Sequence, residues 1–202
     1  MTPSTTLSWQ VTLGNVLRRT VVLLFLIALA LYFSSESGQF LTERNLTNIA
    51  QQNAHVIIVT IGMTLTMLVG GIDLSVGSVA ALAGAISAGL IVREGLPIEV
   101  SVLLTLAMGF AIGLTNGALV VFGKLPPFVA TLSSMGVVRG LTLLYTNGKP
   151  ISGMGDAYTR WGRDSLAVPL IGNVPLPVIV ALVVVALALL LLTRLRFGLH
   201  IY

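Results

Sequence analysis

The chain has 202 residues, of which 55% are hydrophobic and only 9% are charged, and its mean hydropathy is +0.99. Soluble domains carry about 25% charged residues, so this composition excludes an ordinary water-soluble fold and indicates a multi-pass protein of the lipid bilayer. The net charge of +4 does not indicate a nucleic-acid partner, because the basic residues lie mostly at the edges of apolar segments. The absence of cysteine excludes disulfides and thiolate metal sites.

Six apolar segments follow one another along the chain and are predicted to be helices. They are Thr20–Phe33, Ala54–Val69, Val76–Val92, Ile98–Phe122, Phe128–Tyr145 and Leu176–Thr193. A helix needs about 20 apolar residues to cross the hydrocarbon layer, which the fourth segment reaches and the sixth approaches. We therefore expect an all-α transmembrane helix bundle that forms a single membrane-spanning domain over residues 1–202, with about six spans.

The distribution of charge predicts that the N-terminus lies in the cytoplasm. With six crossings, the cytoplasmic side receives five basic residues and no acid, whereas the outer side receives five basic residues and six acids. This sign agrees with the positive-inside rule and depends mainly on Arg18, Arg19, Arg194 and Arg196. The first segment also fits a cleaved signal peptide, but its basic region is long and further membrane segments follow it.

An aspartate lies inside an apolar stretch, in the run from Gly70 to Ser78. A carboxylate at bilayer depth costs at least ~2.5–3.5 kcal/mol, and the preceding Gly70 and Gly71 can break a helix. A charge at a broken helix is typical of a solute or ion pathway. Alternatively, Asp73 or Ser75 caps the following helix by accepting an amide hydrogen. We expect a pair of short or broken helices around residues 70–77, with Gly70, Gly71, Asp73 and Ser75 as candidate gating residues.

Arg139 is the other charge predicted to lie within the membrane. A buried guanidinium must be paired or face water, so Arg139 either pairs with Asp73, snorkels to the interface, or binds carbonyl groups or a second subunit. Asn116 and Thr131 are uncharged polar residues on the fourth and fifth segments. They are candidates for lining a solute pathway together with Arg139, although hydrogen bonding between helices is the commoner role of such groups.

Two further patterns concern packing and the longest loop. Small residues recur every fourth position at residues 81, 85 and 89, at 109, 113 and 117, and at 136 and 140, which predicts close contacts between helix backbones. Residues 147–177 are rich in glycine and proline and are predicted to form an outer loop with many turns. Tyr158 and Trp161 in this loop either dock an extracytoplasmic partner or belong to a lid over the helix ends.

Several catalytic chemistries are excluded by the motifs that the chain lacks. Ala118 occupies the first glycine position of a phosphate-binding Gly-x4-Gly-Lys-Ser/Thr run, and Leu125 follows Lys124 where serine or threonine should stand. The chain also lacks the zinc-protease and serine-hydrolase motifs and an acidic cluster for a metal. We therefore expect no catalytic residue, cofactor or metal, and any ATP hydrolysis must come from another subunit.

Three stretches resemble the permease subunits of bacterial ATP-binding-cassette sugar importers of the ribose type. They are Gly62–Leu65 with Gly70–Ser78, then Pro127–Leu132 with Arg139–Gly140 and Tyr145–Ile151, and finally Leu195–Tyr202. The resemblance extends from about Leu41 to Tyr202. In that family a cytoplasmic loop that engages the ATPase follows the position of Tyr202, so we expect this chain to be truncated at its C-terminus, corresponding to the N-terminal two-thirds of a permease.

The resemblance implies a multi-pass subunit of the bacterial inner membrane that translocates a small sugar, ribose or a similar one. The implied partners are a second permease subunit, an ABC ATPase subunit and a periplasmic sugar-binding protein. One alternative is a secondary transporter that couples to protons through Asp73 and His55, and another is a truncated membrane protein without transport activity. Uptake that collapses with an uncoupler while ATP is held constant would favour the secondary transporter.

Overall fold

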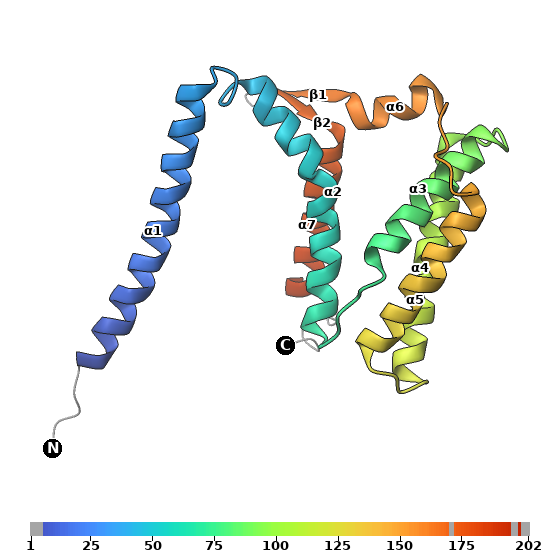
Figure 1. Cartoon of the computed structure of the whole chain (residues 1–202), viewed down its shortest axis with the longest axis horizontal. Helices are drawn as coiled ribbons and strands as arrows, with labels where there is room; N and C mark the ends of the chain where they lie inside the picture. Colours follow the sequence, from blue (N-terminus) through green and yellow to red (C-terminus); the bar gives the residue numbers. More distant parts are fainter. Residues whose placement is uncertain (1–5, 170–171, 195–197, 199–202) are drawn as a thin grey trace. The chain divides into compact units, whose positions relative to one another are not determined.

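The computed structural model describes residues 6–169, 172–194 and 198. In chain order its elements are α1 (Thr6–Glu36), α2 (Glu43–Leu68), α3 (Val76–Val92), α4 (Ile98–Val121), α5 (Pro127–Thr146), α6 (Gly155–Arg163), β1 (Ser165–Val168), β2 (Gly172–Pro175) and α7 (Leu176–Arg194) (Figure 1). Each of the six predicted apolar segments is helical, and the predicted bounds of α3 are matched at both ends. Apart from Gly198, the Leu195–Tyr202 stretch lies outside the described residues.

The chain divides into two compact units, residues 1–50 and residues 51–202. In the first unit, side-chain hydrogen bonds fix the turn between α1 and the start of α2. Asn45 Nδ2 donates to the carbonyl of Phe40 at 2.8 Å, and Thr42 Oγ1 accepts the amide hydrogen of Asn45 at 3.3 Å. Short side chains of this type compete well with helical backbone bonds, so they end one helix and start the next.

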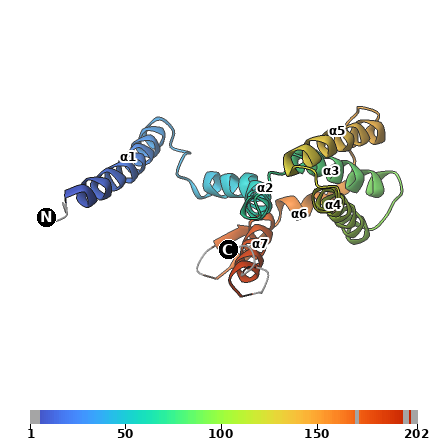
Figure 2. The same ribbon diagram turned by 90° about the horizontal axis from the view of Figure 1, so that it is seen from below.

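In the second unit, α3, α4 and α5 contact one another and form a three-helix bundle (Figures 1 and 2). The sequence sets the ends of these helices. Gly95, with a φ of +65°, and Pro97 separate α3 from α4. Lys124 adopts a left-handed φ of 53° after α4, and Pro127 occupies the first turn of α5, where its missing N–H has no intrahelical acceptor to lose. The two short turns make the three helices antiparallel neighbours.

Only some members of the predicted small-residue rows contact another helix. A Cβ added at Gly113, Gly117, Gly136 or Gly140 would meet no other atom within 4 Å, so these glycines face open space rather than a neighbouring backbone. A close contact is made at Gly89 of α3, a member of the predicted rows, where a Cβ would lie 2.7 Å from Cζ of Tyr145 on α5. A Cβ at Gly109 of α4 would lie 4.0 Å from Cγ1 of Val79 on α3. The spacing of small residues was a correct sign of a smooth helix face, but it could not specify what that face contacts.

The surface of the bundle is suited to lipid rather than water. Phe110, Phe122 and Leu144 are 73%, 84% and 75% exposed, and few large side chains of the described residues are buried. Exposed apolar area on this scale is not found on soluble monomers. Among the described residues, α4, α5 and α7 are each long and apolar enough to cross a membrane, while α3 and residues 20–36 are shorter apolar helices. The predicted all-α membrane bundle is confirmed, and the number of six spans stays a prediction.

The loop of residues 147–177 contains more regular structure than the sequence predicted. Within residues 147–177 lie the helix α6 and a small antiparallel sheet, in which Ser165 pairs with Pro175 and Val168 with Gly172. The strands have four residues each, which is too short for an alternating pattern to stand out in the sequence. The amide of Leu176 donates to the carbonyl of Asp164 at 2.9 Å and closes the hairpin at the start of α7.

Candidate functional site

The helix α2 ends in a glycine turn between the two halves of the predicted broken element. Gly70 has a φ of +78°, which a side chain would disfavour. Its amide donates to the carbonyl of Met67 at 3.0 Å, and the amide of Gly71 donates to the carbonyl of Thr66 at 2.9 Å. This pair of bonds is the Schellman arrangement, which satisfies the last carbonyls of a helix. The two glycines therefore end α2 and turn the chain toward Asp73.

The carboxylate of Asp73 organises the start of α3. Its Oδ1 accepts the amide hydrogen of Ser75 at 2.8 Å and the hydroxyl hydrogen of Ser75 at 2.6 Å. Ser75 is 1% exposed, and its own side chain makes no capping bond to a helical amide. Asp73 thus bonds to Ser75, the residue before the first residue of α3, and no side chain of the described residues accepts a helical amide hydrogen at this end, so the predicted capping bond is not formed.

Asn116 of α4 and Thr131 of α5 bind this turn to the helix bundle. Asn116 Nδ2 donates to Ser75 Oγ at 3.1 Å. Thr131 Oγ1 accepts the amide hydrogen of Leu74 at 3.1 Å and donates to the carbonyl of Ile72 at 3.0 Å. Two polar residues that the sequence suggested only as candidates are thus hydrogen-bonded to the turn that contains Asp73.

Arg139 does not join this network. It lies on α5 two turns beyond Thr131, its side chain is exposed, and the described residues contain no ion pair between Arg139 and Asp73. The hypothesis of an Asp73–Arg139 pair therefore has no support from the geometry. His55 is also distant, because it is exposed on α2 13 residues before the end of that helix, which corresponds to about 20 Å of helical rise.

A cavity of about 350 Å³ opens beside the network. Its polar lining includes Asp73, Asn116 and Thr131, and the rest of its wall is formed by Thr66, Val69, Gly71, Ile72, Gly113, Gly117, Val120, Val121 and Pro127. The sequence had given Gly113 and Gly117 a packing role only. Both lie within one turn of Asn116 on α4, and this helical spacing was the signal that the glycines leave room beside the amide.

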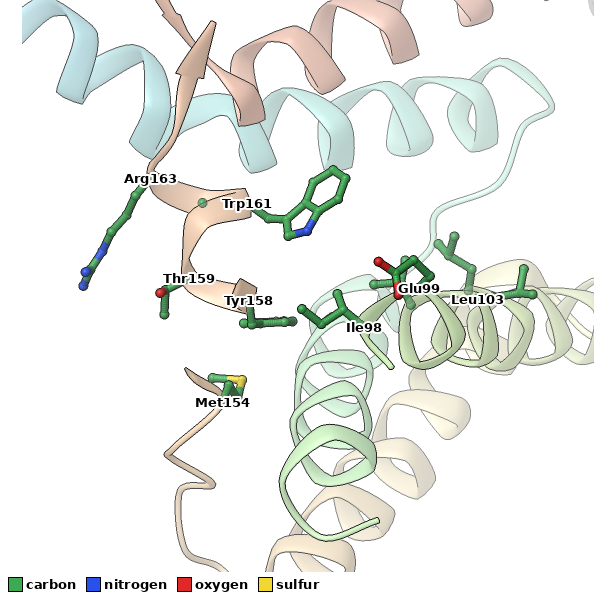
Figure 3. A pocket seen from close by; sticks show the side chains of 11 residues that line it. Ile98, Glu99, Leu103, Met154, Tyr158, Thr159, Trp161 and Arg163 are labelled. Carbon is green, nitrogen blue, oxygen red and sulfur yellow. The ribbon is translucent and has the colours of Figure 1, made fainter. Parts of the chain in front are cut away.

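A second, larger cavity of about 810 Å³ lies between the start of α4 and the α6 region (Figure 3). Tyr158 and Trp161 project from α6 toward Ile98 and Leu103, while Arg163 points away from α4. The lining of this larger cavity is mainly apolar, and Glu99 is the only acidic residue in it. Tyr158 and Trp161 therefore face the start of α4, and both the docking surface and the lid over the helix ends stay predictions.

The fold defines a multi-pass membrane protein with buried polar residues in two places. One group holds the broken turn through Asn116 and Thr131, and the other joins α3 to α4, where Ser101 Oγ donates to the carbonyl of Ser87 at 3.0 Å. Comparison with known families gives this class a name. The family model described as "Branched-chain amino acid transport system / permease component" matches residues 45–202, and the chain belongs to this family. No solved structure matches the chain.

Curated relatives cover nearly the whole chain. The ribose import permease protein RbsC of Escherichia coli (strain K12) is 40% identical over 185 residues, which are 90% of this chain and 55% of the relative. The protein of the same name in Bacillus subtilis (strain 168) is 35% identical over 93% of this chain and 57% of its own length. The D-allose transport system permease protein AlsC of Escherichia coli (strain K12) is 33% identical over 87% of this chain and 52% of its own length. The resemblance to sugar permeases is confirmed, and the chain spans somewhat more than half the length of these relatives.

Proposed function

We propose that this chain is a membrane-spanning subunit of an ATP-driven importer that moves a small sugar such as ribose across the bacterial inner membrane. The observation that carries the proposal is the 40% identity, over 90% of the chain, to a protein named a ribose import permease. The matched region contains both the broken turn and the polar residues that hold it.

The arrangement of the turn suits alternating access. Gly70 and Gly71 form a joint between α2 and α3, while Asp73 and Ser75 attach the start of α3 to the bundle through Asn116 and Thr131. Hydrogen bonds of this kind can be exchanged as a unit when two helices shift by a small amount. In this proposal Gly70, Gly71, Asp73 and Ser75 form the gate, Asn116 and Thr131 line the pathway beside it, and the exposed Arg139 contributes to the pathway from α5.

In this proposal the energy comes from a separate ABC ATPase subunit, which agrees with the lack of a Gly-x4-Gly-Lys-Ser/Thr run in the given sequence. The other proposed partners are a second permease subunit and a periplasmic sugar-binding protein. Proton coupling through Asp73 and His55 is disfavoured, because about 20 Å of helix separates His55 from the turn.

The test is uptake of radiolabelled ribose by cells that express this chain with a cassette ATPase and a sugar-binding protein from the same bacterium. We expect uptake that depends on all three proteins, is inhibited by vanadate and persists when an uncoupler is added at constant ATP. Uptake that is lost with the uncoupler and is unaffected by omission of the ATPase would contradict the proposal and support a secondary transporter. Absence of uptake under every condition would support a membrane protein without transport activity.

A further inference from the structure

The buried side chain of Asn116 has an acceptor that the protein does not use. The residue is 7% exposed and donates through Nδ2 to Ser75 Oγ, but no described residue donates to its Oδ1. A buried acceptor without a donor costs about 1–3 kcal/mol, so such groups are rare in stable proteins and each one needs an explanation.

The hydrogen bonds around Ser75 determine which end of the amide is left free. The Ser75 hydroxyl carries one hydrogen, and its Oγ lies 2.6 Å from Asp73 Oδ1, an atom that can only accept when the carboxyl is ionised. Ser75 must therefore accept its other hydrogen bond, and Asn116 must supply the hydrogen through its NH₂ group. Turning the amide over would place two acceptors against each other, so the free atom is the carbonyl oxygen.

The free oxygen belongs to a residue that lines the cavity of about 350 Å³, and Asp73 lines the same cavity. Asp73 uses Oδ1 for both of its bonds to Ser75, and no described residue donates to its Oδ2. The site thus offers two unused acceptors, one of them charged. Valines, a proline and glycines form most of the remaining wall, and none of the lining residues is basic.

We propose that this cavity binds the hydroxyl groups of a small sugar or polyol, with Asn116 Oδ1 and Asp73 Oδ2 as the acceptors. The inference rests on the proposed transport function and assigns a position to its substrate. Vicinal hydroxyls supply the hydrogens that the two oxygens lack, while the C–H face of the sugar lies against Val69 and Val120. The volume falls within the range of about 300–1,000 Å³ that is typical of small-molecule sites.

Other occupants fit less well. A single bound water takes up about 30 Å³ and would leave most of the cavity unfilled. A calcium ion needs about 6–8 oxygen ligands, whereas the wall consists mainly of apolar side chains. A zwitterionic amino acid, as the family's description would suggest, could place its ammonium group on Asp73, but its carboxylate would then lie in a mainly apolar wall with no basic residue to balance it.

The test uses the absence of cysteine from the chain, which allows single cysteines to be introduced without prior changes. Val120 lines the cavity, whereas Val137 on α5 is 64% exposed and does not line it. The full chain is placed in lipid nanodiscs as Val120→Cys or Val137→Cys, and the rate of maleimide labelling is measured with ribose, ribitol, leucine or sodium chloride. At a ribose concentration about nine times Kd, labelling of Val120→Cys should slow about tenfold, with no change at Val137→Cys.

Two second-site variants in the Val120→Cys background test the assigned atoms. Asn116→Leu removes the free acceptor and should abolish protection by ribose. Asn116→Leu also breaks the bond to Ser75, so a second variant must leave the network intact. Gly117→Leu fills the cavity without removing any bond of the network, since a Cβ at Gly117 meets nothing within 4 Å. The matched control is Gly136→Leu, which has equally open surroundings away from the cavity and should retain full protection.

Protection by ribose and ribitol that is lost in both variants and kept in the control would support the proposal. Protection by sodium or leucine alone, protection unaffected by Gly117→Leu, or no protection by any compound would overturn it. The proposed function is tested separately by uptake. ATP-dependent uptake without protection would refute only the assignment of the sugar to this cavity. Protection without uptake would support the binding site and refute the proposed import function.

Discussion

Replacing Thr131 with valine should destabilise the attachment of the α2–α3 turn to α5. Valine has nearly the same shape as threonine but cannot accept the amide hydrogen of Leu74, which lies 3.1 Å from Thr131 Oγ1. An amide left without an acceptor costs about 1–3 kcal/mol. The lost donor to Ile72 adds little, because the single hydroxyl hydrogen is shared with the carbonyl of Pro127 in the same helix, also at 3.0 Å. We expect a loss of about 2 kcal/mol, or roughly a 30-fold larger unfolding constant.

The assay is reversible unfolding in mixed micelles, with the fraction of SDS as the denaturant and helical circular dichroism as the signal. Thr131→Ser keeps the hydroxyl and should lose less than about half of the valine effect. Thr115→Val is the matched control, because Thr115 is exposed and its hydroxyl bonds only to the carbonyl of Ala111 in the same helix, so it should change stability by less than about 0.5 kcal/mol. Equal stability of Thr131→Val and the parent chain would refute the proposed role of this hydroxyl.

Two further predictions use the same unfolding assay. Gly89→Ala should destabilise the bundle by about 1–2 kcal/mol, because the added methyl group would lie 2.7 Å from Cζ of Tyr145, whereas Gly84→Ala on the same helix meets nothing within 4 Å and should be neutral or stabilising. A harmless Gly89→Ala would show that the Tyr145 ring moves aside freely. Asp73→Asn and Arg139→Leu should have additive effects to within about 0.5 kcal/mol, because the two side chains do not pair, and a coupling well above that value would revive the ion pair.

Much of the fold could be predicted from the sequence, because helices in lipid are apolar over most of their length and end at glycine and proline. The predicted bounds of α3 were matched at both ends, and the predicted start at Phe128 lies one residue from the observed start of α5 at Pro127. The hairpin of β1 and β2 was missed, because four-residue strands carry too little pattern. The small-residue rows included Gly89, which makes a close contact, but did not indicate which of their members would make one, because spacing along one helix reports a smooth face and not its neighbour.

The candidate site was predictable in part. Asp73 stood out because a carboxylate in an apolar stretch is costly and therefore informative. Elimination suggested Arg139 as its charged partner. In the structure the carboxylate instead accepts hydrogen bonds from the neutral Ser75, and Asn116 on α4 donates to Ser75 in turn. Sequence can identify a buried charge, but the choice between a charged partner and a set of hydrogen bonds depends on helix rotation. That rotation is fixed by tertiary packing, which places Arg139 on an exposed face.

In the proposed importer subunit, α3, α4 and α5 cross the membrane together, with the polar turn at their cytoplasmic end. Single cysteines at three exposed loop positions measure this: Lys124→Cys between α4 and α5, Glu94→Cys after α3, and Lys149→Cys after α5. In intact spheroplasts, a membrane-impermeant maleimide should label the cysteines at 94 and 149 and should reach that at 124 only after the membrane is opened. Labelling of all three from the same side would contradict the account.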